Sequence, residues 1–554
     1  MFLEKTWIPL NNEVPKNITK VFEILKKNRG LIEKSNLDIK KILLNPNIAK
    51  IDNKNINKLS KDIIKIKKNG KNILIHGDYD VDGITSTAIF YEFLINIGFK
   101  KENIKTFIPN RFRHGYGLSK ESLKDIFKQY SHKNTPLIVL VDCGITANKN
   151  IKKLKEKGFK VTVIDHHTLT KKKPKADYIF WNNKITASAL TYLTVKLLEI
   201  SIIGSTNITR SVDLASLGYV ADLGDLKNPI GRAITKKGLE VFNKKTRPNI
   251  KALLKKEGLI NTFELGWIIG PRINATGRIS SPKKSLELLL EDKFENINKL
   301  SYEIEKINSL RRKNTNTMFQ EALIGVSNKK YPGLNNNDKV IIAHSEEFHE
   351  GIIGLISSKL RQHFFKPTIC IAWEGNIGKG SCRSIPGVNI VNILETQKHL
   401  LESFGGHTQA AGFTILKKNF LKFQKQILKI AKKQIPKSLL KPSIEYDMEL
   451  PENLIKYDIL ELIKKLEPFG NGNPEPLFVT KNLSIKEIHN LGKEKKHLKI
   501  IFNEIRTPTI YFNGKEHSPT LQKGMLVKIL YSLDRNYWNG NNYLQIKIKD
   551  VKKM

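Results

Sequence analysis

The sequence predicts an α/β protein in which a parallel-sheet domain is joined by a long helix to a smaller α/β domain, with an all-β barrel in the C-terminal part. Short β-branched runs alternate with helical segments from residue 72 onward, which is typical of βαβ units. A long charged stretch with helical spacing and few breakers follows, from about residue 281 to 326. After residue 476 the pattern changes to short strands separated by turns, which indicates the barrel.

The length and composition are those of a globular protein with several domains. The chain has 554 residues, of which 40% are hydrophobic and 27% charged, so we expect about three or four domains. In chain order, the pattern predicts a basic helical cap over residues 1–65, the first α/β domain over 66–280, the connecting helix over 281–328, the second α/β domain over 329–435 and the barrel over 436–554.

Composition also narrows the class of protein. No apolar run reaches the roughly 18 residues that a membrane helix needs, and the first residues lack the pattern of a secretion signal. We therefore expect a cytoplasmic protein without a membrane partner. Cys143, Cys370 and Cys382 have no CxxC spacing, which argues against a disulfide framework and against a thiolate zinc site.

The formal net charge of +42 suggests a polyanionic partner, because Lys and Arg that neutralise phosphates release counterions. Lys, Asn and Ile abound throughout the chain, so a mutational bias of the genome explains the charge equally well. Arg is scarce against this background. The remaining Arg residues are therefore candidates for positions that need a flat, bidentate guanidinium.

The sharpest motif is HGDYDVDG, which directly follows the predicted strand NILI. Its carboxylates Asp78, Asp80 and Asp82 alternate at the carboxyl end of a strand, where open α/β sheets bind their ligands. Three close carboxylates repel one another unless cations neutralise them. A calcium loop starts similarly, but it needs a Glu at position twelve, where this chain has Ile89. The motif therefore favours a metal site of another kind.

Two further strand ends offer ligands on the same edge of the sheet. LIVLVD delivers Asp142, and KVTVIDHH delivers Asp165, His166 and His167. An Asp-His-His triplet after an apolar strand divides naturally into ligands and an orienting carboxylate. The segment YVADLGDL adds Asp222 and Asp225 after a predicted helix. There, solvated acids at the end of a helix explain the pattern nearly as well.

These motifs resemble a known superfamily. HGDYDVDG, VDCG, DHH and VAD in this order are similar to the DHH phosphoesterases, and SFGGHTQAAGF is similar to their companion DHHA1 domain. PRINATGRI, GKGSCRSIPG and EPFGNGNPEP resemble segments of the RecJ exonuclease family. The resemblance implies a single-stranded-DNA-specific 5′-to-3′ exonuclease that releases 5′-mononucleotides in DNA repair and recombination.

The resemblance also implies roles for individual residues. Two divalent ions, Mn²⁺ or Mg²⁺, would be held by Asp78, Asp80, Asp82, Asp142, His166 and Asp222. Oxygen-rich ligation with one imidazole suits these ions better than zinc or copper. The catalytic set would be Asp80, Asp142, His166 and His167. In this set Asp142 would bridge the ions and His167 would face the substrate phosphate, with Asp165 orienting the histidines.

Glycine-rich segments downstream are candidates for binding the substrate. Beside His167, the proposed phosphate contacts are Arg278, Ser381, Arg383, Ser384, Gly406 and His407. Each segment taken alone is better explained as an ordinary turn, and only together with the metal motifs do they favour substrate binding. The barrel resembles an OB fold, which binds single strands with basic and aromatic residues. Its candidates are Tyr511, Phe512, Tyr531, Tyr537 and Trp538, most of which we expect in the core.

The chain departs from the family pattern at two places. Ile279, Ser280 and Ser281 follow Arg278 where acidic residues are usual, and Gly224 and Asp225 stand where a Pro is usual. Neither change removes a proposed ligand.

Two other functions remain alternatives: a DHH-family oligoribonuclease or cyclic-dinucleotide phosphodiesterase, and a non-catalytic single-strand-binding scaffold. Besides single-stranded DNA, the resemblance suggests a helicase and a single-strand-binding protein as partners.

Overall fold

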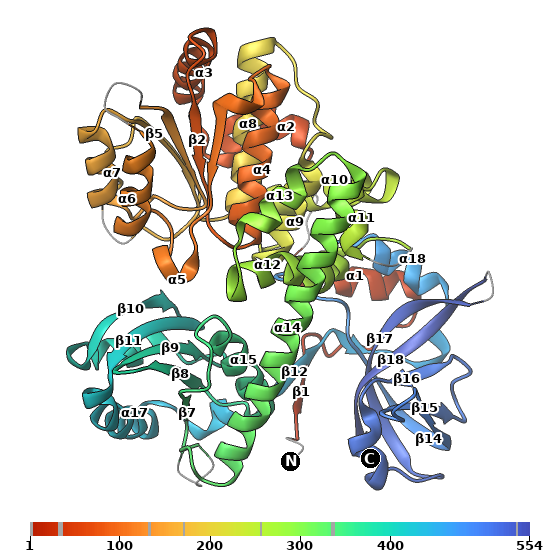
Figure 1. Cartoon of the computed structure of the whole chain (residues 1–554). Helices are drawn as coiled ribbons and strands as arrows, with labels where there is room; N and C mark the ends of the chain where they lie inside the picture. The colour runs from red at the N-terminus through yellow and green to blue at the C-terminus, as the bar shows by residue number, and fades with distance from the viewer. Residues whose placement is uncertain are drawn as a thin grey trace. The chain divides into compact units, whose positions relative to one another are not determined.

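The computed structural model describes residues 4–30, 37–130, 135–169, 172–254, 258–333, 338–538 and 541–554, without the side chains of 516–518, 537, 538 and 541 (Figure 1). The chain forms two compact units. One comprises Met1–Ile8 and Lys306–Glu445, and the other Pro9–Glu305 and Tyr446–Met554. We call them the first and the second unit and describe each by itself.

The second unit contains a parallel sheet of five strands in the order β3-β2-β4-β5-β6. The strands are β2 (Ile73–His76), β3 (Ile104–Phe107), β4 (Leu137–Val141), β5 (Lys160–Asp165) and β6 (Tyr178–Trp181). The chain moves from β2 to β3 on one side and then returns to β4 on the other. This reversal creates a crevice at the carboxyl ends of β2 and β4, where doubly wound proteins bind ligands.

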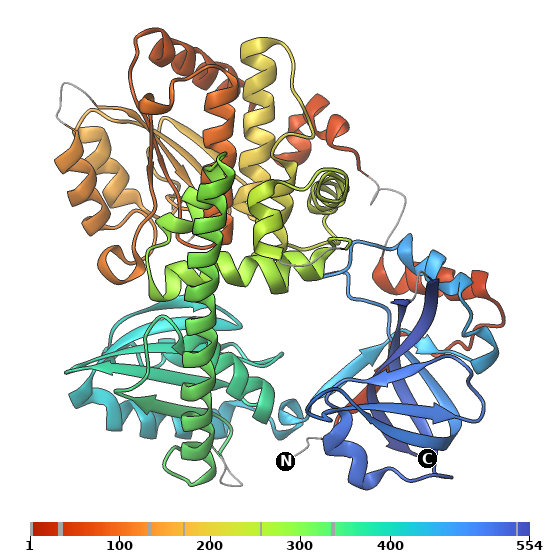
Figure 2. The ribbon, with the colours of Figure 1, turned by 45° about the vertical axis from the view of Figure 1, so that its right-hand side comes forward.

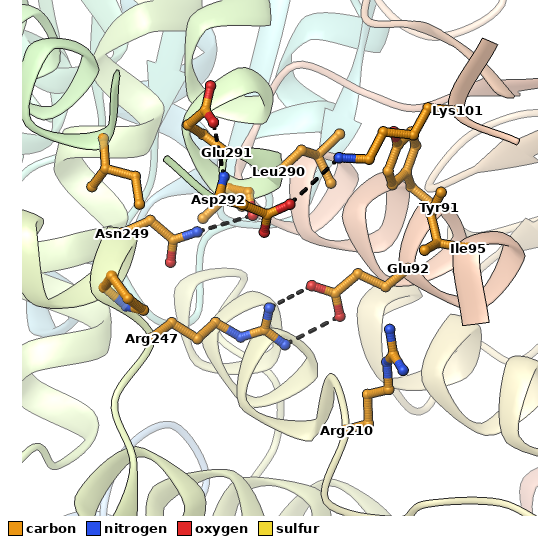
Figure 3. A pocket seen from close by; sticks show the side chains of 13 residues that line it. Tyr91, Glu92, Ile95, Lys101, Arg210, Arg247, Asn249, Leu290, Glu291 and Asp292 are labelled. Carbon is orange, nitrogen blue, oxygen red and sulfur yellow. Dashed lines mark hydrogen bonds and ion pairs between the residues drawn. The ribbon is translucent and has the colours of Figure 1, made fainter. Parts of the chain in front are cut away.

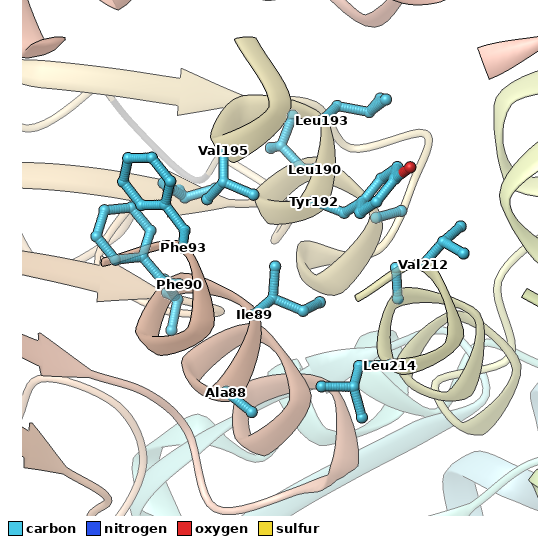
Figure 4. Close-up of a cluster of buried hydrophobic side chains, with 14 of the residues drawn as sticks. Ala88, Ile89, Phe90, Phe93, Leu190, Tyr192, Leu193, Val195, Val212 and Leu214 are labelled. Atoms are coloured by element: carbon cyan, nitrogen blue, oxygen red, sulfur yellow. The ribbon is translucent and has the colours of Figure 1, made fainter. Parts of the chain in front are cut away.

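Helices cover both faces of this sheet, as expected for strands that are apolar on both sides. One face packs against α3 (Asn53–Lys68), α4 (Val81–Asn96), α8 (Ala187–Ile203) and α9 (Val212–Ala221). The opposite face packs against α6 (Lys120–Gln129) and α7 (Asn148–Glu156). Side chains alternate accordingly, since Ile73 and Ile75 join the first core and Leu74 joins the second. Figure 4 shows the apolar contact between α4, α8 and α9.

Further helices continue the second unit after the sheet. They are α10 (Pro229–Lys244), α11 (Pro248–Leu254), the π-helix η5 (Glu264–Ile269), α12 (Gly270–Ile279) and α13 (Lys283–Leu290). The 34-residue helix α14 (Phe294–Ser327) begins in the second unit and ends in the first. The stretch predicted as one connecting helix over 281–328 thus contains two helices.

The first unit contains a mixed sheet in the order β10-β11-β9-β8-β7. Its strands are β7 (Ile341–Ser345), β8 (Thr368–Glu374), β9 (Ile377–Arg383), β10 (Leu401–His407) and β11 (Ala410–Leu416). Only β7 and β8 pair in parallel among the strands of this sheet that the structure describes. The helices are α15 (Ile353–Phe364), α16 (Ile390–Glu395) and α17 (Phe420–Gln434).

A barrel completes the second unit (Figure 2). Its strands follow one another in the order β14 (Phe478–Leu491), β15 (His497–Phe502), β16 (Thr509–Tyr511), β18 (Asn541–Lys553) and β17 (Leu526–Trp538). Strand β17 pairs with β14 and so closes the barrel. The short strand β13 (Met448–Glu449) pairs in parallel with the start of β14, and α18 (Asp458–Lys464) lies between these two strands in the chain. The predicted fold class is confirmed: a parallel sheet, a smaller mixed sheet and a closed barrel.

The predicted helical cap is divided among different parts of the fold. Strand β1 (Thr6–Pro9) pairs with β12 (Ser443–Tyr446), and α2 (Ile39–Leu44) and α3 join the core of the parallel sheet. Helix α1 (Ile18–Arg29) packs into the core of the barrel. The domain boundaries that the sequence predicts stay predictions. In the described residues, no helix is long and apolar enough to cross a membrane.

Two of the barrel's candidate stacking residues lie in its core. Tyr511 and Tyr531 are buried, as expected for strand aromatics, whereas Phe512 is 48% exposed. The side chains of Tyr537 and Trp538 lie outside the described residues.

Candidate metal centre

The loop between β2 and α4 carries the first three carboxylates. Asp80 caps α4, because its Oδ1 accepts the N–H of Gly83 at 3.1 Å. Asp82 lies in the first turn, and its two carboxylate oxygens accept the N–H groups of Ala187 and Ser188 at 2.8 and 3.0 Å. A Cβ at Gly83 would lie 2.5 Å from the backbone N and O of Asp78. Glycine is therefore required for the helix to approach the loop so closely.

Asp142 follows β4 in a left-handed conformation with φ +59°. Its N–H donates to Ile164 O at 3.0 Å, so the residue continues the β4–β5 pairing by one step. A non-glycine residue held there costs on the order of 1 kcal/mol or more, a strain typical of functional sites. The side chain is buried, and Asp142 Oδ1 accepts no hydrogen bond. Asp78 Oδ1 is in the same situation.

Asp165 hydrogen-bonds to the two histidines that follow β5. Its Oδ1 accepts the backbone N–H of His166 at 2.7 Å and that of His167 at 3.1 Å, and lies 2.7 Å from His167 Nδ1. Its Oδ2 accepts the N–H of Ile145 at 2.8 Å. These bonds occupy both oxygens of Asp165, which matches its predicted orienting role.

The structure brings together all six proposed metal ligands. His166 Nε2 lies 3.3 Å from Asp142 Oδ1, 3.6 Å from Asp222 Oδ2 and 3.8 Å from Asp82 Oδ2. Three groups each have ligand atoms within 4.8 Å of one another: Asp78, Asp80 and Asp142; Asp82, His166 and Asp222; Asp142, His166 and His167. Asp142 and His166 each belong to two of these groups. Asp225, by contrast, belongs to none of these groups, and its Oδ1 accepts the N–H of Lys227.

Electrostatics in this cluster favours cations. Burial raises the pKa of Asp78 and Asp142 well above the usual range, and the nearby carboxylates raise it further. Burial and the charges of Asp82 and Asp80 likewise raise the pKa of Asp222, although its side chain is 36% exposed. The acids therefore cannot all ionise without positive charge beside them.

Three residues that the sequence reasoning missed lie beside this cluster. Tyr116 Oη is 2.6 Å from His167 Nε2. The guanidinium of Arg111, the first residue of α5 (Arg111–His114), lies 4.3 Å from the ring centroid of Tyr79. Its charge opposes the rise in the pKa of Asp78. The segment NRFRHGYG offered a signal, since two of the scarce arginines stand there among aromatic residues.

Arg278 lies near the same loop, at the end of α12. A Cβ at the preceding Gly277 would lie 2.8 Å from Tyr79 O, so this end of α12 packs against the chain between Asp78 and Asp80.

The other predicted substrate residues lie together in the first unit. Ala410 pairs with Arg383 on one side and with His407 on the other, so these two residues share one end of the sheet. Arg383 Nη1 donates to Ser381 Oγ at 3.2 Å, and Ser384 Oγ donates to Val388 O at 2.7 Å. Gly406, with φ +145°, approaches Ala410 O so closely that a Cβ would lie 2.4 Å away.

A pocket of about 420 Å³ elsewhere in the second unit is a different feature (Figure 3). None of the proposed ligands lines it. Its Arg247 is bound by Glu92 and by Asp213, with Nη2 at 3.1 and 3.0 Å from their carboxylates. These ion pairs hold the chain just before α11 against α4 and α9. The proposed metal ligands lie in the carboxylate cluster and not in this pocket.

Comparison with known proteins identifies the family. The model of the DHH family, N-terminal domain, matches residues 72–221, that of the DHHA1 domain matches 337–433, and that of the RecJ OB domain matches 446–550. The single-stranded-DNA-specific exonuclease RecJ of Haemophilus influenzae is 28% identical, over 99% of this chain and 98% of that protein. The chain thus contains DHH, DHHA1 and RecJ OB domains, and it is similar to a RecJ exonuclease over nearly its whole length.

Other RecJ proteins support the assignment. RecJ of Bacillus subtilis is 30% identical over 86% of this chain, which spans 61% of that relative's length. The crystal structure of RecJ from Thermus thermophilus in complex with Mn²⁺ matches with a TM-score of 0.81 and 26% identity, covering 99% of this chain and 80% of that one. A crystal structure of exonuclease RecJ bound to manganese matches 69% of this chain and 95% of its own, with a TM-score of 0.58 and 28% identity.

Proposed function

We propose that this chain is a metal-dependent exonuclease that degrades single-stranded DNA in the 5′-to-3′ direction and releases 5′-mononucleotides, serving DNA repair and recombination. The observation that carries the proposal is the cluster of five carboxylates and the imidazole of His166 at the switch point of the parallel sheet. The relatives from Haemophilus influenzae and Bacillus subtilis are named as single-stranded-DNA-specific exonucleases, which supports the substrate class. The proposed direction rests on the family likeness.

The donor set fits two divalent ions, Mn²⁺ or Mg²⁺. The proposed ligands are Asp78, Asp80, Asp82, Asp142, His166 and Asp222. They are mostly oxygen donors, which these ions prefer, and the buried Oδ1 atoms of Asp78 and Asp142 lack any hydrogen-bond partner. When bound, such a pair of ions stabilises charge on the attacking and leaving oxygens and lowers the pKa of a coordinated water.

The chain's own residues orient the phosphate. Burial by itself lowers the pKa of His167, but the hydrogen bond and charge of Asp165 outweigh it and raise the pKa to about 9. His167 is therefore a proton donor at neutral pH, and its Nε2 already faces the hydroxyl of Tyr116. We propose that this nitrogen donates to a phosphate oxygen of the substrate. Arg111, stacked on Tyr79, supplies a fixed positive charge nearby.

We propose that the first unit and the barrel supply further DNA contacts. In the first unit, Ser381, Arg383 and His407 share one end of a sheet and present hydroxyl, guanidinium and imidazole groups that suit a phosphate. Ser384 and Gly406 shape the turns around them. The match to the RecJ OB domain supports single-strand binding by the barrel. A helicase and a single-strand-binding protein are further proposed partners.

The two alternatives are less well supported. An oligoribonuclease or cyclic-dinucleotide phosphodiesterase has no need of the closed barrel. A non-catalytic scaffold has no need of the proposed ligands, all of which are present and converge.

End-labelled DNA tests the proposal directly. With Mn²⁺, a 5′-labelled single strand should release labelled mononucleotide at once, whereas a 3′-labelled strand should shorten progressively and a blunt duplex should resist. Asp80→Asn should abolish release, and the matched exposed variant Asp292→Asn should not, since Asp292 pairs only with Lys101 at the surface among the ion pairs found in the described residues. Immediate mononucleotide release from 3′ ends, or equal rates on blunt duplex, would contradict the proposal.

A further inference from the structure

Asp222 is held differently from Asp80 and Asp82 of the proposed ligands. The Asp80 and Asp82 carboxylates accept backbone N–H groups, as described above. None of the hydrogen bonds found among the described residues reaches the carboxylate of Asp222. Asp222 follows the last residue of α9, and its own N–H donates to Gly218 O at 3.0 Å. Its side chain is also the most exposed among the proposed ligands that form ion pairs with His166. Its position therefore depends on the backbone around it.

The turn after Asp222 contains a residue in a strained conformation. Leu223 adopts the left-handed conformation, with φ +56°, which glycine or asparagine usually supplies at a helix end. Its side chain is 71% exposed, so burial gives little compensation for the strain. Two backbone bonds close the turn, from Leu223 to Val220 at 3.2 Å and from Gly224 to Tyr219 at 2.8 Å. Tyr219 Oη also donates to Asp225 O at 2.8 Å. The turn has further support from outside.

That support comes from the GNGN loop, which we define as residues 470–473. Asn471 binds the turn at two points. Its side-chain Nδ2 donates to Leu223 O, and its own carbonyl accepts the N–H of Leu226 at 2.8 Å. A Cβ at Gly472 would lie 1.8 Å from Asp225 Oδ1. The glycine therefore allows the backbone of the loop to approach the carboxylate of Asp225 closely.

The GNGN loop is itself rigidly anchored within the second unit. Buried Asn473 donates through Nδ2 to Leu466 O and to Pro468 O, both at 2.8 Å. Arg232 of α10 donates to Leu466 O at 2.9 Å and to Glu467 O at 2.6 Å. The loop leads into β14 of the barrel. The residue next to the Asp222 ligand is thus fixed by the segment that begins the barrel.

We propose that the GNGN loop positions Asp222 for metal binding, with Asn471 as the positioning residue. The inference rests on the proposed function, because it takes Asp222 as a metal ligand. It also gives the EPFGNGNPEP motif a role: the segment preceding the barrel completes the metal centre. Partners that orient metal ligands typically contribute 10- to 100-fold to metal affinity or activity. The loss of Asn471 should act at the lower end of that range, since the loop keeps its other anchors.

The test compares Mn²⁺ binding by the wild type, Asn471→Ala and a matched control in the full chain. Asn503→Ala is a suitable control, because it also removes an exposed asparagine whose Nδ2 donates a hydrogen bond, in this case to Ser484 Oγ within the barrel. Calorimetric titration should show Mn²⁺ binding about tenfold weaker for Asn471→Ala and unchanged for Asn503→Ala. The Mn²⁺ concentration for half-maximal exonuclease rate should rise by the same factor. The rate at saturating Mn²⁺ should return to within about twofold of wild type, which a merely misfolded variant would not do.

Two further variants keep the outcomes distinct. Asn471→Ser is a milder change, because it replaces the amide with a shorter hydroxyl donor. Its Mn²⁺ affinity should lie between those of the wild type and Asn471→Ala, and it replaces the alanine variant if that variant does not fold. Asp222→Asn should weaken Mn²⁺ binding at least as much. Normal Mn²⁺ affinity in folded Asn471→Ala or Asn471→Ser overturns the positioning role. If the wild type binds Mn²⁺ but cleaves no DNA, the proposed function fails, while the binding data still decide the role of Asn471.

Discussion

Replacing Asp142 by Asn should stabilise the metal-free protein while removing its response to metal. The ligand atoms of Asp78, Asp80 and Asp142 lie within 4.8 Å of one another. Two unit charges at that distance repel by about 3.5 kcal/mol at an effective dielectric constant of about 20. Proton uptake relieves part of this repulsion, because burial raises the pKa of these acids. Asn keeps the shape and tolerates the left-handed φ. We therefore expect a gain of about 1 to 3 kcal/mol near pH 8.

Denaturation in EDTA and in Mn²⁺ measures both effects. The wild type should gain about 2.7 kcal/mol when Mn²⁺ is at a hundredfold excess over its dissociation constant, whereas Asp142→Asn should gain far less. The exposed Asp292→Asn variant should match the wild type in both conditions. The reasoning is refuted if Asp142→Asn is less stable than the wild type in EDTA and gains as much from Mn²⁺.

Buried and paired groups elsewhere in the chain provide further tests. Burial lowers the pKa of His76 to about 4, so the unfolded chain binds more protons than the folded one below pH 6.5. The free energy of unfolding should therefore fall by about 2 kcal/mol from pH 7 to 5. His76→Gln should flatten this pH dependence in denaturant titrations, and an unchanged pH dependence would contradict the prediction. Arg29 and Asp447 form a buried, bidentate ion pair with contacts of 2.6 and 3.0 Å. Arg29→Met should destabilise the second unit by about 3 to 5 kcal/mol, because it leaves the Asp447 charge buried without its partner. The double variant Arg29→Met, Asp447→Leu should recover much of this loss in melting experiments. Arg383→Ala should raise KM for single-stranded DNA with a smaller effect on kcat, because it removes a proposed phosphate contact; a normal KM in steady-state kinetics would exclude it.

The sequence was most informative where function depends on strand ends. The carboxyl ends of parallel strands meet at one edge of a sheet, so Asp78, Asp142 and His166 could be placed together from short apolar runs and the residues after them. Asp222 was more ambiguous, since it follows a helix and an acidic helix end is common. Only the tertiary packing of α9 against α4 shows that Asp222, and not Asp225, joins the cluster of proposed ligands.

Contacts between distant segments could not be predicted. The packing of α1 into the barrel depends on the pair Arg29 and Asp447, which are 418 residues apart, and local periodicity carries no such information. The same holds for Asn471 and Leu223, which are 248 residues apart. The predicted connecting helix contains a break for a similar reason. Leu286, Leu288 and Leu289 are buried in the core of the parallel-sheet domain, and no Gly or Pro marks the end of α13 at Leu290.

The number of Mn²⁺ ions bound per chain tests the central claim most directly, because the account requires the converging carboxylates to hold a pair of ions. Equilibrium dialysis of the full chain, with Mn²⁺ counted against protein concentration, should give two ions per wild-type chain and fewer for Asp142→Asn, in parallel with the loss of mononucleotide release from single-stranded DNA. A wild-type chain that binds no Mn²⁺, or an Asp142→Asn chain that binds two with unchanged affinity, would contradict the account.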